Sequence, residues 1–548
     1  MANTSSRTLR LLSLLQTRRY WPGAELAGQL HVSPRRLRRD IGRLRELGYP
    51  IQAQRGVAGG YQLAGADRLG AGLGRPLQPG RSEFRAAPWP GLRIQINTRL
   101  LNRVPEAARE MSTGSKCFCG VTPGPPRGEG GSMTTPTVTG RGRLTALRAA
   151  WLFDGTGSAL IPDPLVVIDG GTVVAVGSGT SAPQGADVVD LGGAALLPGL
   201  VDTHVHLAFD ASADPVGALA DRDDEQARQA MIRAGQAALR GGVTTVRDLG
   251  DRDYLSLGLR GQPGLPTILT AGPPVTTPGG HCHYLGGVAE PTEAGVRAAV
   301  REHVERGVDV IKIMASGGSL TPGTWQHLPQ FTPEVLRAAV DEAHRHGLQV
   351  TAHAHAVGAI ADAVAAGADG LEHVSFWTED SVDAPAELIQ LIADRRTVVG
   401  ATVGMVPVPG LMPPPEIRAR LPLIVANTRR MYESGAQIVA GTDAGIAPVK
   451  PHDVLRQAPD MLREIGFGQA EALRAITSVA AGVIGLGHRK GRIAPGFDAD
   501  ILAVDGDPVA DPGALHRIRA VWARGAAVPD AGSRRGEAPA VSPRPAVR

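Results

Sequence analysis

Short apolar runs alternate with amphipathic segments through the middle of the chain, from about residue 199 to residue 484. The runs have the length of strands, and they end near His206, Asp248, Thr270, Lys312, His353, His373, Thr402 and Asp443. Most intervening segments have helical spacing; residues 332–347 begin with Thr332 as a cap and Pro333 in the first turn, and end at Gly347. Eight strand–helix units predict an α/β fold, a (β/α)8 TIM barrel, whose chemistry lies at the carboxyl ends of the strands.

Both flanks of this region have a different pattern. Residues 133–198 and 485–526 contain short alternating strands separated by glycine turns. Two β-rich flanks around one long middle segment predict a small β-sandwich assembled from both of them. Residues 527–548 are rich in small and polar residues and are predicted to form a disordered tail.

The first 66 residues have the pattern of three helices followed by a hairpin. The third helix can start at Ser33 as the cap and end at Gly48, and it has an apolar stripe at Leu37, Ile41, Leu44 and Leu47. Residues 67–132 are rich in Gly, Pro and Arg and lack periodicity, which predicts a disordered linker. Met133 resembles a natural start, so residues 1–132 are interpreted as a fused module, an upstream start or a shifted reading frame.

Charge separates the first segment from the rest. Residues 1–66 carry 11 arginines and three acidic residues, a net charge of +8, whereas the whole chain carries +4. A basic segment on a mildly acidic body predicts a polyanionic partner for that segment alone. Three cysteines cannot build a disulfide framework, and no apolar stretch is long enough to cross a membrane, so we expect a cytoplasmic protein with no membrane association.

The helix lengths, the turn and the "GVAGGYQL" hairpin of this segment resemble the winged helix-turn-helix of DeoR/YafY-like (WYL-associated) regulators. The resemblance implies that the start of the third helix enters the major groove of DNA. The residues that would contact DNA are Ser33, Arg35, Arg36, Arg38 and Arg39. The alternative is a basic helix that is merely solvated.

Histidines occur in pairs on two of the predicted barrel strands. In "LPGLVDTHVHL", His204 and His206 are two residues apart, so both side chains point to the same side of one strand. Further candidate ligands are His353 and His355 in "VTAHAHAVG", His373 in "GLEHVSF" and Asp443 in "IVAGTDAG". A single buried histidine is usually structural, but imidazoles and a carboxylate that converge from four strand ends favour a metal site.

Lys312 lies between two isoleucines in "VDVIKIMASGG", inside a run that is typical of a buried strand. Burying an ammonium group without a partner is costly, so this lysine is either paired with a carboxylate or chemically used. Burial would lower its pKa and make the neutral amine available.

The blocks "DTHVH", "IKIMASGG", "TAHAHA", "LEHVS", "AGTDAG" and "GRIAPGFDADI" resemble the metal-dependent amidohydrolase superfamily over about residues 144–525. The loop "GGHCHYLGG" is similar to that of the prolidase-like branch, the Xaa-Pro and Xaa-Arg dipeptidases. The resemblance implies that Lys312 is N6-carboxylated and that its carbamate bridges two divalent metal ions. Zinc suits this donor set, although manganese or iron would also fit it.

The resemblance also implies residue roles. His204, His206 and Asp443 would hold the first ion, and His353 and His373 would hold the second, with the carbamate shared. A hydroxide between the ions would attack the amide carbonyl, and Asp443 would act first as general base and then as general acid.

Substrate contacts are implied for His281 and His355 and, more weakly, for Tyr284. The family commonly has glycine after the histidine pair where this chain has Ala356, which leaves the ligands intact but makes the local loop geometry harder to predict.

The expected activity is hydrolysis of a C–N bond in a small molecule such as a dipeptide or N-acyl amino acid, by a homo-oligomer. One alternative is a mononuclear deaminase or cyclic-amide hydrolase of the imidazolonepropionase type, which would lack a ligand at Lys312. Another is a transcription regulator whose barrel only senses a metabolite; a complete ligand set with a proton shuttle argues against it.

Overall fold

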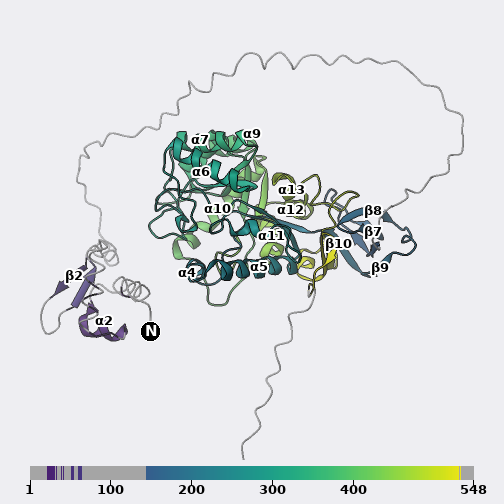
Figure 1. The fold of residues 1–548 in the computed structure, drawn as a ribbon, viewed down its shortest axis with the longest axis horizontal. Coiled ribbons are helices and arrows are strands. Elements are labelled where there is room, and N and C mark those ends of the chain that lie inside the picture. Colours follow the sequence, from purple (N-terminus) through teal and green to yellow (C-terminus); the bar gives the residue numbers. More distant parts are fainter. Residues whose placement is uncertain are drawn as a thin grey trace, which may run out of the picture. The chain divides into compact units, whose positions relative to one another are not determined.

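The structure is a computed structural model that describes residues 144–529, residue 531 and a set of positions between residues 11 and 63 (Figure 1). The chain divides into two compact units, Met1–Gly131 and Ser132–Arg548. The predicted linker at 67–132 and most of the predicted tail at 527–548 lie outside the described residues.

The described part of the first unit combines a helix with a three-stranded antiparallel sheet. Its elements are β1 (Trp21–Pro22), α2 (Gly23–Gln29), β2 (Ile51–Gln54) and β3 (Gly60–Leu63), in the strand order β1-β3-β2. Leu37 and Ile41, two positions of the predicted stripe, are buried in its apolar core. Strands β2 and β3 pair as the hairpin that the pattern predicts.

Eight parallel strands form the centre of the described part of the second unit (Figure 1). They are β11 (Leu200–Val205), β12 (Val243–Asp248), β13 (Thr267–Thr270), β14 (Val310–Met314), β15 (Gln349–Ala356), β16 (Gly370–Trp377), β17 (Val398–Thr402) and β18 (Ile438–Gly441). Strands β11–β13 form one sheet and β14–β18 another, each in chain order.

Main-chain pairs link these two sheets on both sides. Val275, which follows β13, pairs in parallel with Ile313 of β14. Val205 of β11 pairs in parallel with Ala444, which follows β18. All eight strands therefore point their carboxyl ends the same way, in an arrangement of the TIM-barrel type.

Helices alternate with the strands as the apolar pattern predicts. They are α4 (Pro215–Ala220), α5 (Asp224–Arg240), α6 (Glu293–Arg306), α7 (Pro333–Arg345), α8 (Val357–Ala366), α9 (Ala386–Arg395), α10 (Pro415–Glu433), α11 (Ala458–Ile465), α12 (Gln469–Ala475) and α13 (Ser478–Val483), with short 3-10 turns η4 (Leu255–Leu259), η5 (His283–Leu285), η6 (Val454–Gln457) and η7 (Pro512–His516). The Thr332 side chain caps α7 by accepting a hydrogen bond from the Val335 amide, and the helix ends two residues before Gly347. Within the described residues we find no helix whose length and apolar content would suffice to cross a bilayer.

Strands from both flanks of the central region share two further sheets. One has the order β21-β20-β19-β10-β5-β6, and the other has the order β8-β7-β4-β9. Their bounds are β4 (Thr145–Arg148), β5 (Trp151–Leu152), β6 (Ile161–Pro162), β7 (Pro164–Asp169), β8 (Thr172–Ser178), β9 (Asp187–Asp190), β10 (Ala194–Pro198), β19 (Ile501–Asp505), β20 (Ile518–Ala523) and β21 (Ala526–Ala527). One buried cluster joins both sheets and includes Leu147, Val166, Leu196 and Ile501.

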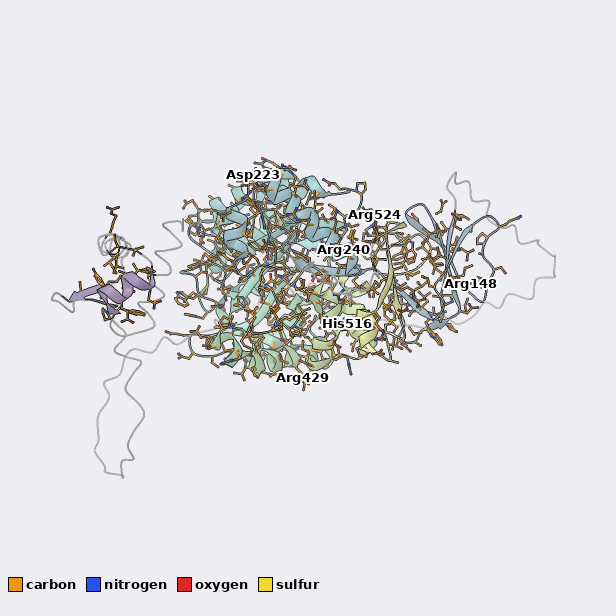
Figure 2. All side chains as sticks on the ribbon, turned by 90° about the horizontal axis from the view of Figure 1, so that it is seen from below. Arg148, Asp223, Arg240, Arg429, His516 and Arg524 are labelled. Carbon is orange, nitrogen blue, oxygen red and sulfur yellow. The ribbon has the colours of Figure 1, made fainter. Side chains whose placement is uncertain are left out.

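An arginine at the β20–β21 turn ties these flanking strands to the central region. The Arg524 guanidinium donates hydrogen bonds to the carbonyl oxygen of Leu265 and to Oγ1 of Thr267 on β13, both at 3.3 Å (Figure 2). These contacts hold the flanking strands to β13 of the central region, whereas the β10–β19 pairing joins the two flanks to each other.

Candidate active site at the carboxyl ends of the strands

A cavity of about 300 Å³ opens at the carboxyl ends of the central strands. The predicted metal ligands all line it: His204, His206, Lys312, His353, His373 and Asp443. They come from the end of β11, from β14, β15 and β16, and from the residues after β18, and together they span more than 200 residues of the chain. The shared direction of the strands is what brings them together.

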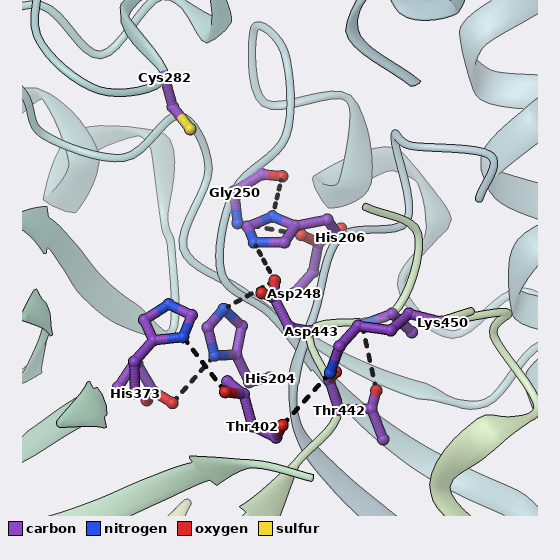
Figure 3. A network of polar contacts seen from close by, with 12 residues as sticks. His204, His206, Asp248, Gly250, Cys282, His373, Thr402, Thr442, Asp443 and Lys450 are labelled. Carbon is purple, nitrogen blue, oxygen red and sulfur yellow. Dashed lines mark hydrogen bonds and ion pairs between the residues drawn. The ribbon is translucent and has the colours of Figure 1, made fainter. Parts of the chain in front are cut away.

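His204, His206 and Asp443 form the first group of donors, with ligand atoms within 4.8 Å of one another. Oδ1 of Asp443 lies 3.3 Å from Nε2 of His206 and 3.6 Å from Nε2 of His204 (Figure 3). Nδ1 of His206 lies 3.0 Å from the carbonyl oxygen of Gly250, which fixes the ring and turns Nε2 into the cavity.

His353, His355 and His373 form the second group under the same criterion. The ring of His373 lies 4.5 Å, centroid to centroid, from the rings of both His353 and His355. Nδ1 of His355 lies 2.6 Å from Oγ of Ser375, and Nδ1 of His373 lies 3.3 Å from Oγ1 of Thr402. His355, for which the sequence predicted substrate contact, thus has the position of a third donor in this group.

Lys312 is the least solvated cationic group of the cavity, with 1% of its surface exposed. Its Nζ atom has no hydrogen-bond partner among the described residues. Burial lowers its pKa to about 8, against the opposing charges of Glu372 and Asp443. The charges of both carboxylates therefore act on Lys312, but no described residue forms an ion pair with its ammonium group.

Most of the clustered histidines are neutral at pH 7, the form that binds metal ions. Burial, aided by the charge of Lys312, lowers the pKa of His204 to about 4. Burial and neighbouring histidines hold the pKa values of His353 and His373 well below 6.5. His206 differs: burial lowers its pKa, but the contact with the Asp443 carboxylate outweighs burial and raises it.

Two of the candidate ligands have a strained backbone conformation. His373 has φ +74° and Asp443 has φ +59°, in the left-handed region that side chains other than glycine rarely adopt. Such conformations cost about 1–3 kcal/mol each and tend to occur where a side chain must be aimed for function.

Glu372 is a site residue that the sequence reasoning missed. Its carboxylate is buried, with Oε2 at 3.0 Å from Nδ1 of His204 and Oε1 accepting hydrogen bonds from Arg247 at 3.0 Å and Thr351 at 2.7 Å. Burial raises the pKa of Glu372, but His204 and Arg247 outweigh burial and bring it to about 2. A carboxylate behind a ligating histidine orients the ring and increases its basicity. Its position next to His373 in "GLEHVSF" was the available signal.

Asp202 and Lys450 support the Asp443 end of the cavity. The Asp202 carboxylate accepts hydrogen bonds from Oγ1 of Thr442 at 2.6 Å and from its amide at 2.9 Å. The Lys450 ammonium donates to the carbonyl oxygens of Thr442 at 2.6 Å and Thr402 at 3.3 Å (Figure 3). These contacts fix Thr442, the residue immediately before Asp443.

The substrate residues predicted from the "GGHCHYLGG" loop have different positions. His281 lines the cavity, and its ring lies 4.8 Å from that of His353. Cys282, which was not predicted to take part, also lines the cavity; burial raises the pKa of its thiol to about 12. Tyr284 is not among the described cavity-lining residues, and its hydroxyl instead lies 3.7 Å from Sγ of Cys282.

The predicted DNA contacts are described only in part. Ser33 and Arg39 are exposed, and the carbonyl oxygen of Ser33 accepts a hydrogen bond from the Leu37 amide, as in the first turn of a helix. Arg35, Arg36 and Arg38 lie outside the described residues.

Known proteins and family models resemble this chain in sequence and in fold. The family model "Amidohydrolase family" matches residues 195–528, and the model "HTH domain" matches residues 7–62. The ochratoxinase of Aspergillus niger is 28% identical over 433 residues, 70% of this chain and 85% of the relative. The imidazolonepropionase of Deinococcus deserti is 28% identical over 411 residues, 67% of this chain and 92% of the relative.

A solved structure of a Xaa-Pro dipeptidase with bound methionine superimposes with a TM-score of 0.61 at 27% identity, covering 70% of this chain and 99% of the other. The nitrogen and carboxylate donors around the cavity suit a divalent ion, and an unpartnered buried amine lies among them. The expected resemblance is confirmed: the chain belongs to the amidohydrolase family, as a prolidase-like, metal-dependent hydrolase of carbon–nitrogen bonds with a helix-turn-helix domain at its amino terminus.

Proposed function

We propose that this chain is a binuclear amidohydrolase that cleaves an amide or peptide bond in a small molecule such as a dipeptide or an N-acyl amino acid. The observation that carries the proposal is the pairing of two donor groups, each with three members, with the unpartnered Nζ of Lys312 in one cavity. The Xaa-Pro dipeptidase and the ochratoxinase among the relatives support hydrolysis of an amide.

The proposal includes a single closed (β/α)8 barrel over residues 199–484, made of both central sheets, because bridges link the sheets on both sides. The β-sandwich would comprise residues 133–198 and 485–526, whose strands share one buried cluster.

The two groups of donor residues would provide ligands for two metal ions. His204, His206 and Asp443 would hold one ion, and His353 and His373 the other; His355 is placed to assist the second group or to contact the substrate. Nitrogen and oxygen donors of this kind favour zinc.

Lys312 would complete both ion sites as a carbamate. Its neutral Nζ would attack the carbon of carbon dioxide and lose a proton to solvent, and the two carboxylate oxygens of the product could serve as metal ligands. A pKa near 8 keeps part of the amine neutral at pH 7, as this reaction needs.

Two divalent ions held by these groups would supply a hydroxide nucleophile at neutral pH and polarise the carbonyl group of the substrate. The second carboxylate oxygen of Asp443 accepts the proton of the nucleophile and delivers it to the departing nitrogen. Asp443 is ionised at neutral pH because His204 and His206 hold its pKa below the ordinary value despite burial. His281 and His355 line the cavity where they can hold the substrate carbonyl or carboxylate.

Turnover by the full-length, zinc-loaded protein tests this proposal. A panel of dipeptides and N-acetyl amino acids is followed by the appearance of free amine. We expect chelation to abolish turnover, zinc to restore it, and Asp443→Asn to lower kcat by at least about a hundredfold. A protein that binds two ions but cleaves no member of the panel would contradict the proposal.

The imidazolonepropionase relatives support one alternative, hydrolysis of a cyclic amide by a mononuclear site. In that case Lys312 would have a structural role, and one ion per chain would suffice. Metal stoichiometry separates the two functions.

A DNA-binding role for residues 1–66 rests on the helix-turn-helix match and on the exposed Ser33 and Arg39. Helix-turn-helix proteins bind paired half-sites as dimers, in line with the homo-oligomer that we expect. Affinity for duplex DNA should fall steeply as salt rises, since counterion release drives the binding of arginines to phosphates; affinity that does not depend on salt would count against this role.

A further inference from the structure

The outer wall of the cavity is formed by an apolar stripe on α10. Ile417, Leu421, Ile424 and Thr428 recur at helical spacing and line the cavity. In the first half of α10 no residue is buried, so Ile417, Leu421 and Ile424 stay half-exposed toward the open space. An apolar stripe of this kind normally packs against a core, whereas here it faces the cavity that holds the metal ligands.

Other elements also contribute apolar side chains to the cavity. The lining includes Trp377 of β16, Val403 and Met405 after β17, and Met461 and Ile465 of α11. The inner end is polar, since it carries the clustered histidines, whereas the outer part is nearly continuous apolar surface.

Charged groups around the outer part would not receive an anion. No arginine is among the described cavity-lining residues. The Arg420 guanidinium of α10 lies 4.6 Å from the ring centroid of Trp377, where it donates to the carbonyl oxygens of Glu416 and Glu379. The Lys450 ammonium is buried and donates to two carbonyl oxygens, and Lys312 lies among the metal ligands at the inner end. The exposed carboxylate of Glu464 lines the cavity and has no ion pair in the described part of the chain, so it would repel a second negative charge.

We propose, on the basis of the function proposed above, that the α10 stripe selects amides bearing a bulky uncharged group, aromatic or branched aliphatic, beside the scissile bond. That group packs against Ile417, Leu421 and Ile424 while the amide carbonyl reaches the inner histidines. An acidic group at the same position would lose its hydration against apolar walls and Glu464 without gaining a cation.

Leucine, asparagine and aspartate provide a matched series, because their side chains have the same branching and nearly the same size. The dipeptides Gly-X and X-Gly, with X as each of the three, place the group on either side of the scissile bond. For the full-length, metal-loaded protein we expect kcat/KM to decrease from Leu to Asn to Asp on at least one side of the scissile bond. The Leu substrate should exceed the Asp substrate by at least about tenfold. A preference for Asp on both sides would overturn the proposal.

Two lysine substitutions on α10 test whether the preference for the Leu substrate depends on the stripe. Ile424→Lys brings a cation into the stripe and should reduce the Leu-over-Asp preference about tenfold or more, chiefly through KM. Leu423→Lys is the control, since Leu423 is 48% exposed and does not line the cavity. Equal changes in both variants would contradict a role for the stripe. Ile424→Ala, which keeps the helix, should weaken the Leu substrate more than the Asn substrate.

Binding measurements test this inference independently of the proposed reaction. Uncleavable phosphinic isosteres of the Leu and Asp dipeptides, measured by calorimetry, should keep the Leu preference in the wild-type protein and lose it in Ile424→Lys. If no dipeptide is cleaved but the isosteres rank in this way, the reaction is wrong and the specificity of the cavity stands. Equal affinity for both isosteres would refute the apolar selection.

Discussion

Lys312 is a residue whose chemistry depends on what surrounds it. The sequence predicted burial from its two isoleucine neighbours, and the structure confirms that burial. Its missing hydrogen-bond partner could not be predicted, because the groups that surround Nζ come from strands distant in the sequence. Only the folded chain distinguishes a lysine that pairs with a carboxylate from one that is left free to react.

The pH dependence of metal loading follows from this lysine. The neutral amine fraction rises as pH rises through the pKa of about 8, so only about a hundredth is neutral at pH 6. We expect metal-depleted protein to regain two ions slowly at pH 6 and faster at pH 8 when dissolved carbon dioxide is held constant. Well above pH 8 the rate of metal loading should not increase further. Loading that is independent of both pH and carbon dioxide would contradict the carbamate.

Glu372 offers a second test at the scale of single residues. Glu372→Gln removes the charge behind His204 and should weaken metal affinity about 10–100-fold, measured by competition with a chelator. It also leaves Arg247 buried without its partner, so thermal stability should fall. Thr351→Val is the control, because it removes one hydrogen bond to Glu372 but keeps the charge. A folded Glu372→Gln protein with unchanged affinity would show that this carboxylate does not support the ligand.

At the scale of elements, strand periodicity was the strongest signal in the sequence. Eight apolar runs that alternate with amphipathic segments predicted the strands, and the parallel direction of those strands brings the histidines and Asp443 to one end. Loop geometry was not predictable in this way: Tyr284 does not line the cavity but contacts Sγ of Cys282, whose amide donates to Thr321, 39 residues further along the chain.

Strands β18 and β11 lie in close contact at Gly441, and a larger residue there is expected to disturb both strands. A Cβ atom at Gly441 would lie 2.5 Å from Cβ of His204, so Gly441→Ala must push the two strands apart. We expect a loss of about 1–3 kcal/mol in unfolding free energy, with weaker metal binding, measured by thermal unfolding and metal titration. Gly482→Ala in α13 meets nothing within 4 Å and should change neither. Normal metal affinity in Gly441→Ala would show that the site tolerates this displacement.

At the scale of the whole molecule, the chain consists of two compact units with different charge and different family matches. Composition and charge separated them in the sequence, since the arginines concentrate in the first 66 residues. How the two units cooperate could not be predicted, because no periodic pattern connects them.

A truncated protein tests the independence of the second unit. Residues 132–548 contain all the described cavity-lining residues, so this fragment should retain kcat/KM within about twofold of the full chain. Circular dichroism would verify that the fragment is folded. A folded fragment without activity would mean that the first unit contributes to catalysis.

Metal content per chain, by elemental analysis of wild-type and Lys312→Ala protein, tests the central claim most directly. Lys490→Met is the control: it removes another buried ammonium, which is paired with Asp500 at 2.5 Å and does not line the cavity. We predict two ions per chain in the wild type and in Lys490→Met, and one or fewer in Lys312→Ala. One ion in every protein would contradict the carbamate-bridged pair and favour a mononuclear hydrolase.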